Sequence, residues 1–342
     1  MKKTLIAMAS VAAFGVAHAE ATVYGLIDMS IGQNQLIGDP QTNIHSGGDA
    51  GSSEGNSTTK IGFKGNADLG SGVKGNFQLE SGGIASNGSV NNNGNFFNRQ
   101  AWVGLSGGFG EVRVGRQDNV PFQVMGEYDF NGASNAASAQ QNAQVAEWSF
   151  FGRQSRSLQY ISPDLKGFTA QVGYQPQGDG YNNATAAAAG ADANKANYSI
   201  GLKYKIDKLS VAVAGQTATA DNPGNGSTSY KYQSFSTAAA SYDFTVVKAM
   251  VGYANGGTGF SGTTVGVIAP VAGFNVGLTY AKNNDTYGNS ATEFYVNREV
   301  LKSTYAYFDY GQLKQDVTNP NGFFATGNTG NNTIALGVIY VF

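Results

Sequence analysis

The residues in this sequence best able to act on another molecule are charged side chains in and around a long polar stretch, Gln117 to Gly152. The basic candidates are Lys60, Arg99, Arg113 and Arg153, and the acidic candidates are Asp118, Glu127, Asp129 and Glu147. Opposite charges that line a narrow aqueous passage attract or repel ions at close range and so select what passes. These side chains are therefore suited to electrostatic selection of ions. Our hypothesis is that the basic and acidic sets face each other and create an electric field across the passage.

Groups that catalyse a reaction or hold a cofactor are scarce. The chain has no Cys and two His; His18 falls in the expected leader, and His45 lies in a Gly/Ser-rich stretch with no patterned partner. This supply favours neither acid-base catalysis by His nor an ordinary zinc site. Calcium-loop spacing and a phosphate-binding Gly-Lys-Ser/Thr loop are missing from the sequence as well. We predict no enzyme, no cofactor and no metal site.

The start of the chain has the pattern of an export signal. Lys2 and Lys3 supply positive charge, Leu5 to Val16 is apolar, and Ala17-His18-Ala19 matches a small-x-small cleavage site. The apolar run is too short for a membrane-spanning helix, which needs about 20 residues. We predict a cleaved signal peptide over residues 1–19 and one domain over residues 20–342.

The composition excludes several classes of protein. Removing the leader takes two Lys and no acid, so 19 basic residues stand against 23 acidic ones, and no nucleic-acid partner is expected. Only 13% of the residues are charged, whereas a water-soluble domain usually carries about 25%. Gly, Tyr and Phe are abundant, at 48, 18 and 20 residues. Charged side chains are therefore too few to account for how this protein's surface is solvated.

Alternation with a period of two residues dominates the chain and predicts strands with one apolar and one hydrophilic face. It is clearest in Val73–Glu80, Phe168–Tyr174, Tyr198–Lys205 and Phe274–Tyr280. Seven short turns and eight longer loops separate the strands, which makes sixteen strands in all. An even strand number, with short turns at one end and long loops at the other, is typical of bacterial outer-membrane barrels.

We therefore predict an all-β fold, a transmembrane antiparallel β-barrel of sixteen strands with short periplasmic turns and long extracellular loops. Closure lets the apolar face meet lipid and leaves no unpaired edge. The last strand, ending in Tyr340 to Phe342, must then pair with the first, Val23 to Gln33. A secreted β-sandwich, such as an adhesin or lectin domain, also alternates, but it buries its apolar face between two sheets.

Several segments, taken in order, resemble one known family. They are Thr22–Asp28, Lys60–Gly65, Asp68–Gly70, Arg99–Ser106, Gly110–Gln117, Tyr160–Pro163 and Tyr340–Phe342. Each segment is weak alone, but their order and spacing extend over essentially the whole chain. The sequence is similar to the trimeric general-diffusion porins of Gram-negative bacteria, most closely to the beta-proteobacterial branch of the Neisseria, Burkholderia and Comamonas type.

The resemblance implies a homotrimer in the outer membrane, in contact with membrane lipid and lipopolysaccharide. It implies a water-filled channel for passive diffusion of small hydrophilic solutes and ions, with weak charge selectivity at a constriction. It also implies that the third outside loop, here residues 117–152, folds into the lumen. Phe342 and Tyr340 would be the signal read by the barrel assembly machinery.

The alternation assigns most basic candidates to the inner face. Outward apolar neighbours turn Lys60, Arg113 and Arg153 inward. Arg99 shares the parity of the outward Val103, so either a β-bulge resets the register or Arg99 snorkels above the membrane edge. The family pattern has a basic constriction residue here, so we favour the bulge. The alternative for any of these charges is that it solvates a loop or pairs with a neighbour.

Other functions remain as alternatives at this stage. A substrate-specific channel for a sugar or small organic acid would need an ordered aromatic ladder in the lumen, to which Trp102, Tyr305 or Tyr307 could contribute. A soluble exported binding module and a barrel used for adhesion are further candidates. The segment 126–130 departs from the enterobacterial loop signature, which leaves the shape of the constriction open. The choice between anions and cations is open as well, because the charge of the whole chain says little about a few residues at the constriction.

Overall fold

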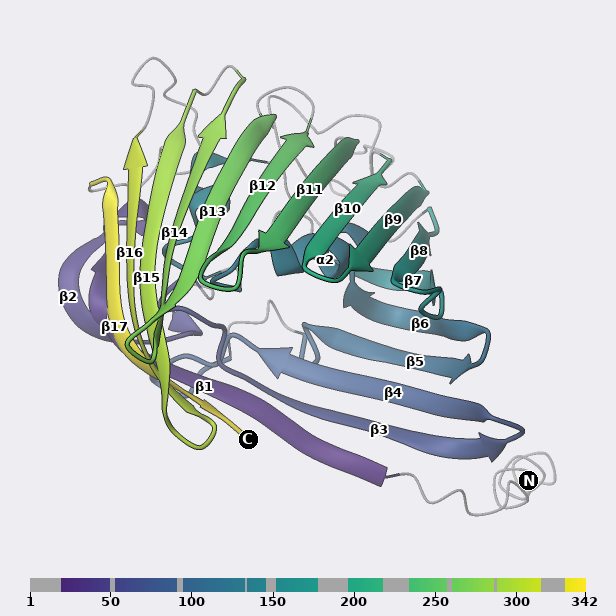
Figure 1. Cartoon of the computed structure of the whole chain (residues 1–342). Coiled ribbons are helices and arrows are strands. Elements are labelled where there is room, and N and C mark those ends of the chain that lie inside the picture. Colours follow the sequence, from purple (N-terminus) through teal and green to yellow (C-terminus); the bar gives the residue numbers. More distant parts are fainter. Residues whose placement is uncertain are drawn as a thin grey trace, which may run out of the picture.

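The strands of this protein form a single sheet that closes on itself. The computed structural model describes residues 20–49, 53–90, 95–132, 134–145, 152–177, 196–217, 234–256, 260–285, 288–314 and 330–342. Successive strands pair antiparallel around the molecule (Figure 1), and the last strand pairs with the first. The predicted fold, an antiparallel barrel of 16 strands, is confirmed.

The elements are short, as expected for strands that cross a bilayer. The strands are β1 (Glu20–Asn34), β2 (Asp39–Ser46), β3 (Lys60–Gly70), β4 (Val73–Gly82), β5 (Gln100–Gly107), β6 (Gly110–Asp118), β7 (Arg153–Ile161), β8 (Phe168–Gln175), β9 (Asn197–Ile206), β10 (Leu209–Gln216), β11 (Phe235–Asp243), β12 (Lys248–Asn255), β13 (Gly262–Val271), β14 (Phe274–Asn283), β15 (Ser290–Leu301), β16 (Thr304–Lys314) and β17 (Asn332–Val341). The helical turns are η1 (Gln35–Ile37), α2 (Val120–Met125), η3 (Gly126–Tyr128) and α3 (Ala139–Ala143). Within the described residues no helix combines the length and the apolar character needed to cross a membrane.

Two of the seventeen strands share one position in the wall. The first half of β1, Glu20 to Leu26, pairs with β3, and its second half, Met29 to Asn34, pairs with β2. Strand β2 was not predicted: one of the eight longer loops was expected over the residues Asn34 to Asn56 that include it. Strand β2 forms because the Asn34 side chain caps η1 and Gly38 adopts a left-handed φ of 87°, which reverses the chain onto β1.

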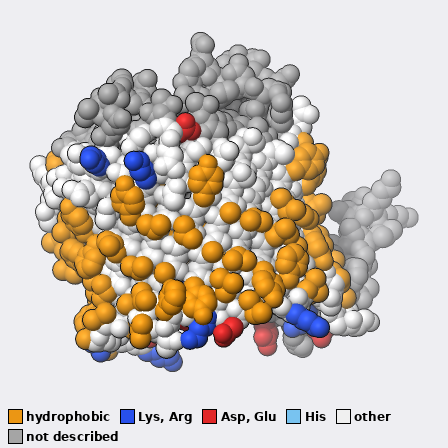
Figure 2. All heavy atoms as spheres, turned by 45° about the horizontal axis from the view of Figure 1, so that its top comes forward, with side chains coloured by type: hydrophobic (Ala, Val, Ile, Leu, Met, Phe, Trp, Pro, Cys, Tyr) orange, Lys and Arg blue, Asp and Glu red, His pale blue; other side chains and the backbone are white. Residues whose placement is uncertain are grey.

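The two faces of the wall differ as the alternation predicted. On β1, Ile27, Met29 and Ile31 are exposed, whereas Asp28 and Ser30 between them are buried inside the barrel. Figure 2 shows hydrophobic side chains spread over the visible outer wall, with charged side chains gathered near its margins. An outer surface of this kind is stable in lipid, where apolar side chains lose nothing by exposure.

The third loop folds into the barrel, as predicted. Helix α2 packs against β8, β9 and β10, η3 against β11 and β12, and α3 against β14, β15 and β16. Asn119 and Ser138 cap the two helices through their side chains, and Pro121 occupies the first turn of α2. The loop therefore follows the inner wall for half of its circumference and narrows the passage from that side.

The apolar core lies between this loop and the wall. One cluster joins Val120, Val124, Met125 and Tyr128 of the loop to Ala212, Ala214 and Ala239 of the wall. A second joins Ala139, Ala143, Val145 and Leu36 to Ala254, Ala281, Ala291 and Leu313. Small wall residues allow the close approach: a Cβ on Gly201 would lie 2.5 Å from Cγ2 of Val124. The wall is thus shaped to hold the loop.

The chain ends seal the barrel. The amide of Gly25 donates to the carbonyl of Phe342 over 2.9 Å, and the amide of Phe342 donates back over 3.1 Å. The Phe342 ring covers Gly25, because a Cβ at that glycine would collide with Cζ of the ring. Tyr340 stacks beside it, with ring centroids 6.1 Å apart. The last residue of the chain therefore takes part in closing the sheet.

Candidate functional site

Glu80 gathers two of the predicted basic residues on the inner wall. Its side chain, on β4, is 5% exposed and pairs with the guanidinium of Arg99 and with Nζ of Lys60, which lies 3.8 Å away. The hydroxyl of Tyr24 donates to the same carboxylate over 2.8 Å. Glu80 was placed on the hydrophilic face of its strand by the alternation, but its role as a partner was not predicted. Its position fixes where the two cations stand.

A second pair lies beside the first, where the third loop joins the wall. Nε of Arg153 at the start of β7 lies 3.1 Å from Asp118 at the end of β6. Gln100 donates to the other carboxylate oxygen of Asp118 over 2.9 Å. The charges of Arg99 and Arg153 both act on Lys60, so the two pairs are neighbours. We call Lys60, Glu80, Arg99, Asp118 and Arg153 the wall cluster.

Arg99 reaches the wall cluster by a route that was not predicted. Strand β5 begins one residue later, at Gln100, and its pairing with β4 runs without a register shift from Glu80 to Lys74. Arg99 lies in the bend before the strand, so strand parity does not apply to it and no bulge is needed. Gly82 leaves room for the side chain, since a Cβ there would collide with Cδ of Arg99. The favoured bulge is replaced by this bend.

Arg113 stands apart from the wall cluster. It lies five residues before Asp118 on β6, which is about 17 Å along an extended strand. Its guanidinium pairs with Glu111 over 2.6 Å and lies over the Trp102 ring, 4.4 Å from the ring centroid. The structure therefore separates this residue from the other three basic candidates and gives it a different partner.

The acidic candidates of the third loop turn toward the wall behind it. Glu127 accepts a hydrogen bond from Ser210 over 2.6 Å and lies 3.3 Å from Nζ of Lys203. Burial opposes ionisation of Glu127, but the Ser210 hydrogen bond and the charge of Lys203 outweigh it and lower the pKa of this carboxyl. Asp129 is 4% exposed and accepts from the amide of Asn131. Glu147 lies outside the described residues. Of the four acidic candidates, Asp118 is the one that the described part of the chain places in the wall cluster.

A buried polar network, not predicted from the sequence, fixes the loop on the far side. Asn56 lies in the segment between β2 and β3, and its amide group donates to Asp309 over 2.8 Å and to Asn131 over 3.1 Å. Asn131 in turn donates to Glu293 over 2.8 Å, and the backbone of Asn56 donates to Asp28. The inward parity of Asp28, Glu293 and Asp309 on otherwise apolar strands was the available signal.

Comparison with known proteins identifies this architecture. A model of the Gram-negative porin family matches residues 4–319. The chain belongs to the Gram-negative porin family. As a porin it is an outer-membrane diffusion channel and not an enzyme.

Relatives agree with the predicted branch of porins. An outer membrane porin protein of Bordetella pertussis is 32% identical over 291 residues, which cover 79% of this chain and 74% of that protein. The major outer membrane protein P.IB of Neisseria lactamica is 29% identical, over 63% of this chain and 58% of that protein. The anion-selective porin from Comamonas acidovorans shares the fold, with a TM-score of 0.70 at 22% identity over 95% of this chain and 100% of that one.

Proposed function

We propose that this porin passes small hydrophilic solutes and ions by passive diffusion, with a weak preference for anions set at the wall cluster. The supporting observation is the excess of cations within the wall cluster: Lys60, Arg99 and Arg153 stand against two carboxylates. A local net positive charge raises the local concentration of anions, and it does so weakly when most cations are paired.

Two further lysines add to this excess. Nζ of Lys64 lies 5.0 Å from the centroid of the Tyr24 ring, and Nζ of Lys248 lies 4.8 Å from that of Phe130 in the third loop. Within the described residues neither lysine forms an ion pair with a carboxylate. Their charge therefore remains available to passing anions.

The measurement is the reversal potential of the purified protein in a planar bilayer under a KCl gradient. Wild-type protein is expected to show the sign of anion preference. The double variant Lys60→Gln, Arg153→Gln should move the potential toward cation preference, because it removes two of the three cations of the wall cluster. Lys302→Gln, an exposed lysine in a turn, is the matched control and should leave the potential unchanged. Equal potentials in wild type and the double variant would contradict the assignment.

A substrate-specific channel for a sugar or organic acid finds less support. An aromatic ladder must present ring faces to the solute. Trp102 is 6% exposed and carries Arg113 on its face, and Tyr307 is 3% exposed and donates to Asp28 over 2.7 Å. Neither ring is free to stack on a sugar, so a diffusion channel is the better proposal.

The proposal extends to processing, oligomeric state and assembly, for which the sequence pattern and the family are the support. In this proposal the leader over residues 1–19 is removed before Glu20, the mature chain forms a homotrimer in contact with lipid and lipopolysaccharide, and Phe342 and Tyr340 are read by the barrel assembly machinery. The rings of both residues are about half exposed on the outer wall, which makes them accessible to a partner. Mass spectrometry of the exported protein tests the cleavage, and heat-sensitive gel migration tests the trimer.

A further inference from the structure

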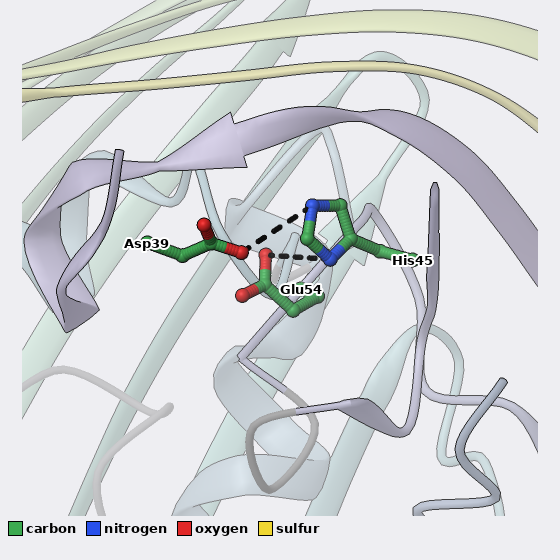
Figure 3. A group of neighbouring side chains, drawn as sticks. All are labelled: Asp39, His45 and Glu54. Carbon is green, nitrogen blue, oxygen red and sulfur yellow. Dashed lines mark ion pairs between the residues drawn. The ribbon is translucent and has the colours of Figure 1, made fainter. Parts of the chain in front are cut away.

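Three side chains near the outer mouth of the barrel converge on one point (Figure 3). Asp39 and His45 come from β2, and Glu54 comes from the segment that joins β2 to β3. Nε2 of His45 lies 3.8 Å from Asp39, and Nδ1 lies 3.9 Å from Glu54. No partner of His45 was predicted from the sequence. The return of β2 along β1 brings Asp39 to it, and the segment after β2 brings Glu54.

The imidazole of His45 is held in one orientation. Its Nε2 lies 3.1 Å from the carbonyl oxygen of Gly32, to which an N–H at that position donates. This bond assigns the proton to Nε2 and leaves Nδ1, which lies 3.9 Å from Glu54, as the nitrogen with a lone pair for a metal. A ring whose second nitrogen donates to a backbone carbonyl is the usual arrangement of a histidine that ligates a metal.

The charges around Glu54 are negative, and no described cation or hydrogen-bond donor offsets the charge of its carboxylate. Glu54 and His45 are almost fully buried, and the charges that act on Glu54 are those of Asp39 and Asp49. Within the described part of the chain, neither oxygen of the Glu54 carboxylate accepts a hydrogen bond, and no Lys or Arg pairs with any of the three residues. A buried carboxylate in this setting is costly without a cation.

We infer that Asp39, His45 and Glu54 form a binding site for a divalent transition-metal ion of the zinc class. One ligand atom from each residue lies within 4.8 Å of the others. Around zinc, ligand atoms of a tetrahedral site stand about 3.3 Å apart, so ligand atoms of the three side chains need to close by up to about 1.5 Å. Asp39, which lies beside Nε2, makes part of this movement toward Nδ1. One nitrogen and two carboxylate oxygens suit zinc, whereas calcium prefers oxygen ligands alone. Water completes the set from the side of Asp39, which is 31% exposed.

A metal here would act on the third loop. Asn135 of that loop donates to the backbone carbonyl of Glu54 over 3.1 Å, and Asn56, two residues after Glu54, donates to Asn131 of the loop. Tying Glu54 to β2 therefore also fixes the segment against which the loop rests. Metal binding is independent of permeation, so failure of the conductance test would leave this site untouched.

The first test measures zinc binding by competition with a chromophoric chelator, using protein purified from outer membranes and stripped of metal. Wild type is expected to bind one zinc ion per chain at this site. His45→Ala should abolish this binding, and Asp39→Asn and Glu54→Gln should each weaken it by at least about tenfold. Asp39→Asn retains the acceptor for the Gln41 amide, so its fold should be preserved. Asp207→Asn, an exposed acid in a distant turn, is the control.

The second test reads the imidazole itself. After leader removal His45 is the sole histidine, so nitrogen NMR of histidine-labelled protein gives one ring to follow. Zinc should shift the Nδ1 resonance while Nε2 keeps its proton. Zinc binding that survives His45→Ala would overturn the inference. A wild-type ring that carries two protons and does not respond to zinc would overturn it as well, since the cation would then be a proton.

Discussion

The inward carboxylate of Glu80 positions three of its neighbours. Tyr24, Lys60 and Arg99 come from three different strands or their ends, and all three bind this side chain. The inward side of Lys60 and Glu80 was predictable from alternation alone. Their pairing was not, because it depends on the register of β3 with β4, in which Lys60 lies opposite Gly82 and Gly62 opposite Glu80.

Glu127 is the residue at which pH acts on the third loop. Its pKa lies below the ordinary value because of Ser210 and Lys203, so ionised Glu127 stabilises the loop above the unfolded pKa of about 4.3. That contribution is lost as the pH falls through the folded pKa. Its size is below about 1 kcal/mol, since the side chain is 34% exposed and water screens the pair.

The prediction is tested by comparing wild type with Glu127→Gln in denaturant unfolding across pH. Wild type should be the more stable near neutral pH; the difference should shrink as the pH falls below about 4.3 and vanish below the lowered pKa of folded Glu127, where both side chains are neutral. A constant difference over the whole range would show that the Glu127 charge does not hold the loop. Asp207→Asn, with no contact to the loop, serves as the control.

At the scale of elements, α2 depends on the glycine beneath it. Gly201 of β9 contacts Val124 and Val120, so Gly201→Val should push α2 off the wall and into the lumen. We expect lower single-channel conductance and a loss of about 1–3 kcal/mol of stability, as for other overpacked sites. Gly126→Ala, in the same loop, has no atom within 4 Å of its added Cβ and is the matched control. Unchanged conductance in Gly201→Val would argue against close packing of α2 on Gly201.

The elements also separate what sequence can and cannot predict. Strong alternation located the long strands. The family resemblance implied that the third loop folds inward, and its length and place identified that loop as residues 117–152. The helices α2 and α3 within it were not predicted, because they have six and five residues and owe their form to packing rather than propensity. Strand β2 was not predicted either. Its residues Thr42 to Ile44 are all exposed, so this stretch has no buried face that would produce alternation in the sequence.

At the scale of the whole molecule, closure of the barrel is the property most open to a direct test. Gly25→Val should displace the Phe342 ring and weaken the last rung of β1 with the chain end. We expect a smaller fraction of folded, heat-modifiable protein in membranes. Gly108→Ala, where the added Cβ meets nothing within 4 Å, should fold like wild type. Equal folded fractions for the two variants would mean that the ring contact is dispensable.

Closure of the barrel by Phe342 also affects where a peptide tag can be added to the protein. Because both the amide and the carbonyl of Phe342 are occupied by Gly25, an affinity tag appended there would have to leave the wall at a seam facing lipid. A tag inserted between Asp207 and Lys208 would instead enter an exposed two-residue turn that lies between β9 and β10 and outside both strands. For purification or labelling, the hairpin is the sound choice and the carboxyl end is not.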